Sequence, residues 1–399
     1  MRLPVIFILL TVMIDAMGIG LIIPVMPDLI QELGGGTLAE AAIWGGILST
    51  TFAVMQFLFG PVMGGLSDRY GRRPVLLVAL VVMALDYVLM ALAGAIWLLL
   101  VGRIIGGITA ATQSTASAYM ADISSPHERA ARFGLVGAAF GAGFVLGPLV
   151  GGLLAEYGTR APFWMAAGLA AGNALFGWIV LKETVTDDTR RAFSWRRANP
   201  LGALRALGRL PGVTRLLLVY FIYYIGFAVY PAVWPYFGKE RFDWSPATIG
   251  LSLALFGVAM AAIQGGLIRP VLRILGERGT VVAGHLFSIA SLVVIAVVPS
   301  GFWVLLLTPM AALGGIIPPA LQGMMSMRVA ADAQGELQGA LTSASALAMM
   351  ISPLVMTATF AQFTDAQAPV YLPGAPFLLA AFLSTVGLAA LVFGVRRRA

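Results

Sequence analysis

This chain of 399 residues is 59% hydrophobic and only 11% charged, with a mean hydropathy of +0.92, which lies far outside the composition of soluble domains. It contains no cysteine, which excludes a disulfide framework, a thiolate nucleophile and a cysteine metal cluster. The net charge of +7 does not indicate nucleic-acid binding, because the basic residues gather at the termini and in alternate loops.

A membrane-spanning helix needs roughly 20 apolar residues. The sequence predicts twelve such helices, six in each half of the chain. The expected spans are 4–27, 41–63, 75–94, 97–120, 133–155, 161–181, 213–237, 247–270, 279–298, 302–325, 337–361 and 372–394. Only Arg2 precedes the first apolar run, Asp15 interrupts it and no small-residue cleavage site follows, so we expect the first helix to stay in the mature protein.

The loop after the second helix carries the residues from Gly64 to Pro74, here called the 64–74 motif. Its glycines favour close helix approach and a tight turn, and its arginines are suited to carboxylates or lipid head groups. The motif predicts a latch that joins neighbouring segments, with an ordinary positively charged loop as the alternative. Its candidate residues are Gly64, Asp68, Arg69, Gly71, Arg72 and Arg73.

Asp15, Asp86 and Arg103 are the only Asp, Glu, Lys or Arg residues that lie away from the ends of the expected spans. Each costs roughly 2.5 to 3.5 kcal/mol in a membrane helix, so a compensating role is expected. A rise of about 1.5 Å per residue places all three at similar depth and predicts a cluster in the amino-terminal half. The cluster is either a proton-coupling site or a static bridge between helices.

The fifth helix contains closely spaced small residues and a proline, here called the 143–152 motif. Small residues four apart permit close packing, and a proline frees a backbone carbonyl and bends the helix. A plain packing seam between helices is the alternative to a functional role for this motif. The residues are Gly143, Gly147, Pro148, Gly151 and Gly152.

A basic connector at 182–212 separates the halves 1–181 and 213–399. All Lys and Arg residues except Arg103, Arg160, Lys239 and Arg241 fall at the termini or in one set of loops, so the connector and both termini are expected to be cytoplasmic. Landmarks recur between the halves at a spacing of 205, which predicts parallel repeats with a cavity between them. The matching pairs are Gly71 and Gly276, Gly134 and Gly339, and Pro148 and Pro353.

The seventh helix carries aromatic residues near helical spacing, suited to stacking a planar ligand. They include Tyr220, Tyr223, Tyr224, Phe227 and Tyr230. An interfacial aromatic belt is the alternative explanation. Gln56 and Gln264 lie in the second and eighth helices and are expected either to contact substrate or to bond neighbouring helices.

The 64–74 motif resembles that of the major facilitator superfamily, which implies that it latches a gate. The 143–152 motif resembles the signature of the antiporter branch of that superfamily. More narrowly, the chain is similar to the tetracycline efflux transporters. The matching stretches are 15–21, 55–57, 86–87, 102–104, 275–278, 319–322 with Gln322, and 334–339.

This resemblance implies an all-α fold of two parallel six-helix halves and alternating access. It implies export of tetracycline as a divalent-metal chelate in exchange for protons, by a protein of the cell inner membrane that has no cofactor of its own and acts as a monomer. The expected partners are a small-molecule drug, protons and lipid, without nucleic acid. Asp15, Asp86 and Arg103 are then the proton-coupling residues, and Gln56, Gln264, Tyr220, Tyr224, Phe227 and Gln322 contact the substrate.

The chain departs from the family in the ninth helix, where Ser288 replaces a carboxylate, and in the eighth, where Met260 replaces a histidine. His285 is expected to be a packed neutral side chain. A multidrug or other small-molecule exporter is therefore the alternative, and a membrane sensor a more distant one. An enzyme is not expected, because the chain lacks a metal or nucleophile constellation.

Overall fold

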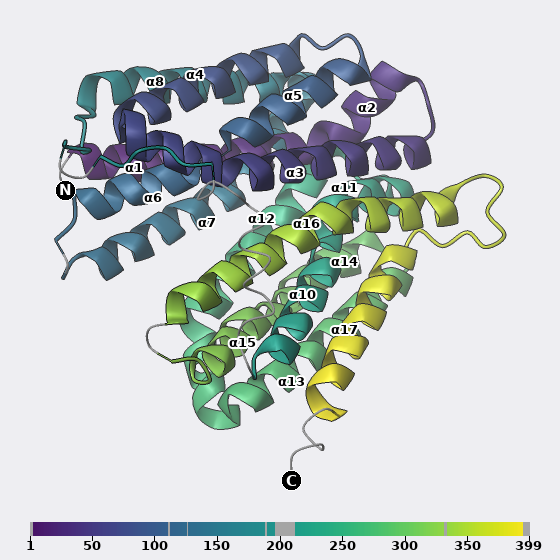
Figure 1. The fold of residues 1–399 in the computed structure, drawn as a ribbon. Coiled ribbons are helices and arrows are strands. Elements are labelled where there is room, and N and C mark those ends of the chain that lie inside the picture. Colours follow the sequence, from purple (N-terminus) through teal and green to yellow (C-terminus); the bar gives the residue numbers. More distant parts are fainter. Residues whose placement is uncertain are drawn as a thin grey trace. The chain divides into compact units, whose positions relative to one another are not determined.

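The computed structural model describes residues 3–110, 112–125, 127–187, 190–195, 212–330 and 333–393, without the side chains of 112, 113 and 130. Within these ranges every regular element is a helix (Figure 1). The amino-terminal helices are α1 (Leu3–Ile22), η1 (Ile23–Val25), α2 (Met26–Gly34), α3 (Leu38–Tyr70), α4 (Arg72–Ala91), α5 (Ile96–Thr109), α6 (Thr112–Asp122), α7 (Arg129–Leu154), η2 (Ala155–Tyr157) and α8 (Ala161–Val180).

The later helices follow the same plan of long apolar segments with short interruptions. They are α10 (Thr214–Phe227), α11 (Val229–Phe242), α12 (Pro246–Ala262), η3 (Ile263–Leu267), α13 (Ile268–Val297), α14 (Gly301–Ala311), η4 (Ala312–Ile316), α15 (Ile317–Ser326), α16 (Gln334–Thr364) and α17 (Ala375–Phe393). Most of the expected connector, at 188–189 and 196–211, lies outside the described residues, as do the ends of the chain at 1–2 and 394–399.

The described residues contain 11 helical stretches that are long and apolar enough to cross a membrane. One of them, Pro246–Val297, has 52 residues. Drawn straight it would extend about 78 Å, more than twice the roughly 30 Å of a bilayer core. Gly276 divides it, because its φ of 65° and ψ of 173° are not helical. The stretch therefore supplies the eighth and ninth expected spans, and the all-helical membrane fold is confirmed.

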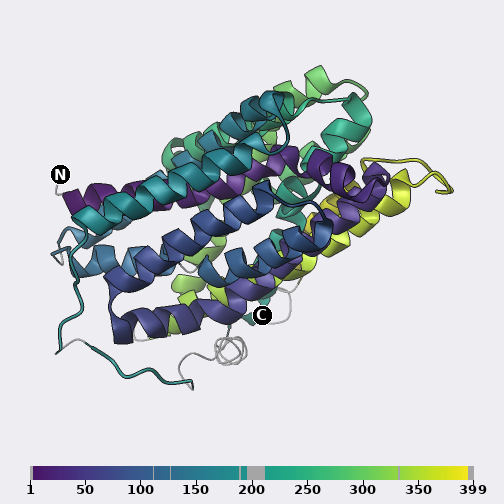
Figure 2. The same ribbon diagram turned by 90° about the horizontal axis from the view of Figure 1, so that it is seen from above.

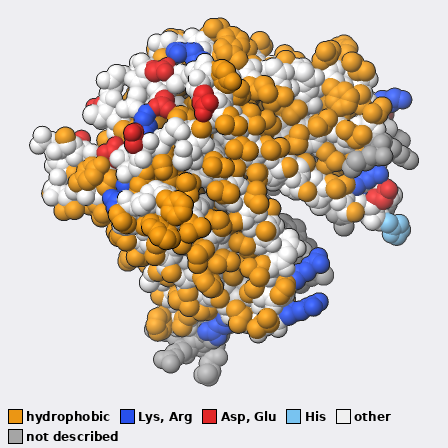
Figure 3. Space-filling model, turned by 180° about the vertical axis from the view of Figure 1, so that it is seen from behind, with side chains coloured by type: hydrophobic (Ala, Val, Ile, Leu, Met, Phe, Trp, Pro, Cys, Tyr) orange, Lys and Arg blue, Asp and Glu red, His pale blue; other side chains and the backbone are white. Residues whose placement is uncertain are grey.

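Large apolar side chains remain exposed along the described helices. Leu85 on α4 is 63% exposed, and Leu175 and Ile179 on α8 are 63% and 74% exposed. Figure 3 shows hydrophobic side chains over most of one face, with charged side chains in a few groups. Soluble monomers rarely expose apolar patches larger than a few hundred Å², so this surface fits lipid.

Contacts divide the chain into two compact units. Unit 1 contains Met1–Gly35, Thr51–Pro200 and Ser245–Ala254. Unit 2 contains Gly36–Thr50, Leu201–Trp244 and Leu255–Ala399. Each unit takes a short segment from the other half of the sequence, and the sequence-based boundaries at 181 and 213 stay a prediction.

In unit 1, α1 packs along α7 and α8, and α4 packs against α8 and α5 (Figure 2). Close approach of α1 and α7 depends on glycines. A Cβ added at Gly143 or Gly147 would lie 2.1 or 2.6 Å from the carbonyl oxygen of Met13 or Met17. The seam between these two helices therefore has no room for larger side chains, in agreement with small-residue packing of membrane helices.

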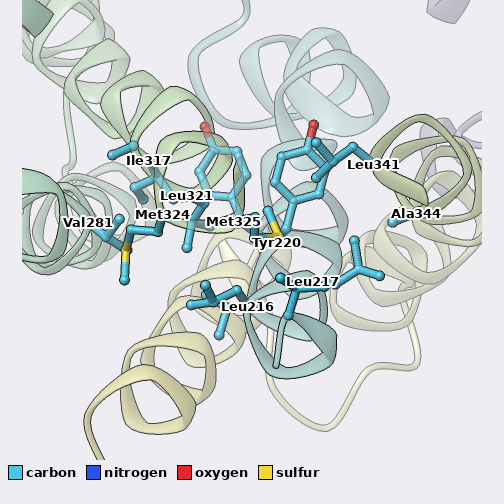
Figure 4. Packing of buried hydrophobic residues seen from close by; sticks show 14 of the residues in the cluster. Leu216, Leu217, Tyr220, Val281, Ile317, Leu321, Met324, Met325, Leu341 and Ala344 are labelled. Carbon is cyan, nitrogen blue, oxygen red and sulfur yellow. The ribbon is translucent and has the colours of Figure 1, made fainter. Parts of the chain in front are cut away.

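In unit 2, α13 packs against α17 and α15, and α10 packs against α17 and α16. Figure 4 shows the buried core that joins these helices, with Leu217 and Tyr220 of α10 between Leu321 of α15 and Leu341 of α16. Val281 of α13 completes the same cluster. This core fixes the face of α10 from which the aromatic residues project.

Candidate functional site

The predicted intramembrane cluster of unit 1 centres on Tyr87. This tyrosine of α4 lies within electrostatic range of Asp15, Asp86 and Arg103. It fills a hollow left by Gly18 of α1, where an added Cβ would lie 2.3 Å from the tyrosine hydroxyl oxygen. Helices α1, α4 and α5 thus bring the three charged side chains into one region, as their estimated depths predicted.

The two partners that would form a static bridge, Asp86 and Arg103, are not ion-paired. No ion pair within 4.0 Å joins Arg103 to an acid among the described side chains. Asp86 is 4% exposed, and its Oδ1 has no hydrogen-bond partner in the described part of the chain. The guanidinium Nη2 of Arg103 instead donates to the sulfur of Met90 at 2.8 Å. The geometry favours an exchangeable site over a permanent bridge.

Asp15 projects from α1 one turn after a polar contact between helices. The Asn173 amide of α8 donates to the hydroxyl of Thr11 at 3.0 Å, and both residues are buried. This bond helps to fix α1 against α8. Asp15 is therefore held on a helix whose position is set from two sides, by α8 at Thr11 and by α7 along the glycine seam.

Arg72 is the centre of the 64–74 motif. Its Nη1 lies 2.5 Å from Oδ1 of Asp68 and donates to the hydroxyl of Ser67 at 2.6 Å. Its Nε lies 3.4 Å from Oδ2 of Asp122, at the end of α6. One planar guanidinium thus joins α3, α4 and α6, a geometry that lysine cannot reproduce.

Glu183, which sequence reasoning missed, closes the same motif. Its carboxylate accepts the backbone N–H groups of Arg72 at 2.9 Å and Arg73 at 3.2 Å, at the start of α4. An acid at a helix amino terminus satisfies free N–H groups and the helix dipole. Gly71 allows this approach, because it has a φ of 108° and an added Cβ would lie 2.2 Å from Glu183 Oε2.

The other members of the 64–74 motif have individual partners. The guanidinium of Arg73 donates to the carbonyl of Trp178 at 3.0 Å and lies over that ring at 5.3 Å. Arg69 lies over the ring of Tyr70 at 5.1 Å. The carbonyl of Gly64 accepts the Ser67 hydroxyl at 2.8 Å. Asp68 and Arg72 are thus the members that pair with each other.

The 143–152 motif packs against two helices. Its Gly151 faces the Leu21 carbonyl of α1, where a Cβ would lie 2.0 Å from the oxygen. Its Gly152 faces the start of α12, where a Cβ would lie 2.4 Å from the Pro246 carbonyl oxygen. Gly250 in turn faces the Pro148 carbonyl, since a Cβ added at Gly250 would lie 2.2 Å from the Pro148 carbonyl oxygen. The motif is therefore a packing seam within unit 1, whatever further role it has in transport.

Three of the predicted substrate residues meet in unit 2. The hydroxyls of Tyr220 and Tyr224 are 3.4 Å apart, and the Gln322 amide of α15 donates to the Tyr220 hydroxyl at 3.3 Å. Phe227 continues this surface by contacting Tyr224, with ring centroids 6.4 Å apart, and Phe256, at 6.3 Å. The result is a run of rings with amide and hydroxyl groups at one end.

The two other glutamines that were predicted to contact substrate, Gln56 and Gln264, have exposed side chains. Gln56 lies on α3 in unit 1, and Gln264 lies in η3 in unit 2. The segment η3 is a π-helix, a local widening often found at functional sites. The adjacent Gly265 and Gly266 are the only signal in the sequence that could have suggested this irregularity.

A small pocket lies within unit 2, lined by residues of α10, α11, α13, α14 and α17. Its polar groups come from Tyr223, Tyr230, Ser288 and Ser384, and the enclosed space suits about one water molecule. The hydroxyl of Ser384 is 2.9 Å from Nδ1 of His285, which is fully buried. Ser288 thus faces a neutral hydroxyl and aromatic lining.

Comparison with known proteins finds relatives that match most of the chain. The family model described as Major Facilitator Superfamily matches residues 8–218 and 216–399. Tetracycline resistance protein, class C, from Escherichia coli is 41% identical over 89% of this chain and 89% of its own. Multidrug resistance protein 2 from Bacillus subtilis (strain 168) is 30% identical over 96% of this chain and 93% of its own. The crystal structure of the human organic anion transporter MFSD10 (TETRAN) is similar with a TM-score of 0.71 at 26% identity, covering 98% of this chain and 99% of that one.

Proposed function

The chain belongs to the major facilitator superfamily and, within it, to the tetracycline resistance proteins, and we propose that it exports a tetracycline as a divalent-metal chelate in exchange for protons. It is a multi-pass membrane transporter for small-molecule drugs and not an enzyme. The proposed location is the cell inner membrane with both termini in the cytoplasm, and the proposed functional form is a monomer.

The observation that carries the proton-coupled part is the unpaired Asp86. A buried carboxyl group is costly in a membrane, and in unit 1 its neighbour Arg103 is bound to Met90 instead. A carboxyl group without a fixed counter-ion is suited to bind and release a proton. Asp15 provides a second such group near the same tyrosine.

The substrate would contact the rings and amides of unit 2. Tyr224 and Gln322 offer hydroxyl and amide groups, and Phe227 offers a ring face for a planar ligand. The hydroxyl of Tyr220, which is only 3% exposed, is bonded to both polar groups and holds them in place. Gln264 of unit 2 is an exposed donor for further polar contacts, and Gln56 of unit 1 is an exposed donor on α3. In this proposal a divalent metal such as magnesium enters as part of the substrate chelate and not as a cofactor of the protein.

A different drug is the second candidate, and Ser288 is the observation that favours it. A cationic metal chelate would be recognised best with negative charge nearby, but the pocket at Ser288 is lined by neutral groups. Unit 2 presents aromatic and hydroxyl groups instead, which suit a neutral planar drug. The relative named as a multidrug resistance protein is consistent with such a substrate.

A drug-susceptibility panel in an efflux-deficient host tests the substrate. We expect tetracycline resistance that is detectable but weaker than that given by the class C relative, because Ser288 supplies no charge. Ser288→Asp should raise it, and Ser291→Asp, one turn away on α13, is the matched control. If the wild type confers no resistance to tetracycline but does to another planar drug, the second candidate replaces the first.

The proposed topology predicts that the connector faces the cytoplasm. Protease added to sealed, right-side-out vesicles should leave the chain uncut between 182 and 212, and the same protease should cut there in inside-out vesicles, because basic loops are retained on the cytoplasmic side. Cleavage of the connector in right-side-out vesicles contradicts this orientation.

A further inference from the structure

Two glycines of α5 form a hollow for the Asp86 carboxyl group. A Cβ added at Gly102 would lie 2.9 Å from Oδ1, and one added at Gly106 would lie 2.9 Å from Oδ2. Real side chains essentially never show such short contacts, so any residue larger than glycine at either position must displace the carboxyl group. The two glycines are four residues apart and therefore lie on one face of α5. We call this hollow the Asp86 socket.

Arg103 lies on the same helix between the two glycines, but it is held by other groups. Its Nη2 donates to the Met90 sulfur at 2.8 Å, and its guanidinium lies over the Phe52 ring at 5.5 Å. Gly102 also accommodates Met90, since its added Cβ would lie 2.8 Å from the Met90 Cγ. The sulfur and the ring of α3 thus give Arg103 a place that is separate from the carboxyl group.

Among the described side chains, the elements packed around Asp86 offer it no alternative ion pair. From α5 only Arg103 is charged, from α1 the nearest charge is Asp15, and α4 itself contributes the Tyr87 hydroxyl. The apolar stretch of α8 contains no acid or base, and its Asn173 bonds Thr11. From α6 the hydroxyl of Tyr119 donates to the Lys182 carbonyl. Helix α3 presents Phe52 here, which carries no charge.

We propose that Gly102 and Gly106 are positioning residues that hold the Asp86 carboxyl group in a socket apart from Arg103, and that this separation leaves Asp86 free to carry the exchanged proton. The inference rests on the proposed proton-coupled export. In each cycle the carboxylate oxygen binds one proton on one side of the membrane and releases it on the other, with no other bond formed or broken.

Gly106→Ala is the sharpest test of the socket. Its added methyl group meets the end of the Asp86 side chain at 2.9 Å, and its next nearest neighbours are two carbons of the Phe52 ring at 3.5 and 3.7 Å, which is ordinary van der Waals contact. The protein should therefore fold, with the carboxyl group displaced. Gly172→Ala on α8 is the matched control, because nothing lies within 4 Å of its added Cβ. Gly107→Ala is a packing control, since its Cβ meets the Phe52 carbonyl oxygen at 2.6 Å and not Asp86.

The first readout is the infrared carbonyl stretch of protonated Asp86 in purified protein at acidic pH, assigned by its loss in Asp86→Asn. In the socket Oδ1 has no hydrogen-bond partner from the described residues, so the wild-type band should lie at high frequency. Gly106→Ala and Gly102→Ala should shift the band, whereas Gly172→Ala and Gly107→Ala should leave it in place. The second readout is pH-driven exchange in proteoliposomes, which should fall by about tenfold or more in the two socket variants, the effect of roughly 1.4 kcal/mol.

Each outcome decides between the socket and its alternatives. If the band stays in place in both socket variants, the inference is wrong, even where transport falls, because the glycines then serve helix packing alone. If the band shifts but exchange stays at the wild-type rate, the socket does not serve coupling and the inference is also wrong. If the band shifts while the wild type shows no pH-driven exchange, the positioning role stands and proton-coupled export fails. Should Gly106→Ala not fold, Asp86→Glu applies the same test, because its extra methylene group does not fit the socket.

Discussion

Asp86→Asn should reduce pH-driven drug exchange in proteoliposomes to the rate of passive leak, and Asp15→Asn should do the same or nearly so. Asparagine keeps the size of the side chain but cannot bind and release a proton. Because Asp15 and Asp86 are the only acids inside the expected spans, no other intramembrane carboxylate is present to take over. Ligand binding measured without a pH gradient should persist in part.

The Asn variants should also be well expressed, which separates coupling from folding. The charge of an aspartate costs roughly 2.5 to 3.5 kcal/mol in a spanning helix, so its removal does not make insertion less favourable. Asp365→Asn, in the exposed loop after α16, is the control for loss of an acid outside the membrane, and it should exchange as the wild type does. Normal exchange in both Asp15→Asn and Asp86→Asn would show that coupling does not use these carboxyl groups.

The helical spans were predictable because bilayer thickness fixes the length of an apolar run. Most expected and observed ends agree to within about five residues, but the first two stretches run on to Gly34 and Tyr70, seven residues beyond the expected ends at 27 and 63. Only the interruptions themselves, such as the π-helix at Gln264, were beyond an apolar-run argument, since they depend on local backbone hydrogen bonds.

Depth along a helix was predictable as well, but side-chain partners were not. Counting residues placed Asp86 and Arg103 near each other. That Arg103 donates to Met90 and not to Asp86 depends on side-chain rotamers and on the space left by Gly102 and Gly106, which residue counting does not give. Glu183 was missed for a related reason. It lies in the connector, where no periodic pattern exists, and its role becomes visible only once the start of α4 is placed beside it.

The second large effect is expected at Arg72, where Arg72→Ala should strongly impair turnover. The substitution leaves Asp68 and Asp122 facing each other without the guanidinium that now bonds both, at 2.5 and 3.4 Å. Hydrogen bonds to charged groups contribute on the order of 1.5 to 3 kcal/mol each, and their loss exposes like charges. Arg72→Lys should recover only part of the function, because a single ammonium cannot span both carboxylates in a fixed fork.

A control and a double-mutant cycle separate a latch from a general loss of positive charge. Arg132→Ala removes an arginine that, like Arg72, forms an ion pair with an acid four residues earlier, here the exposed Glu128 at 3.2 Å. Ion pairs at this spacing on a helix contribute only about 0.3 to 0.5 kcal/mol. It should transport nearly as the wild type does. If Asp68 and Arg72 act as one latch, Asp68→Asn, Arg72→Ala and the double variant should lose turnover to a similar extent, since each breaks the same contact. Additive losses would mean that the two residues act separately. Undiminished turnover in Asp68→Asn would remove the latch from the mechanism. Arg72 and Glu183 would then only tie α3, α4, α6 and the start of the connector together.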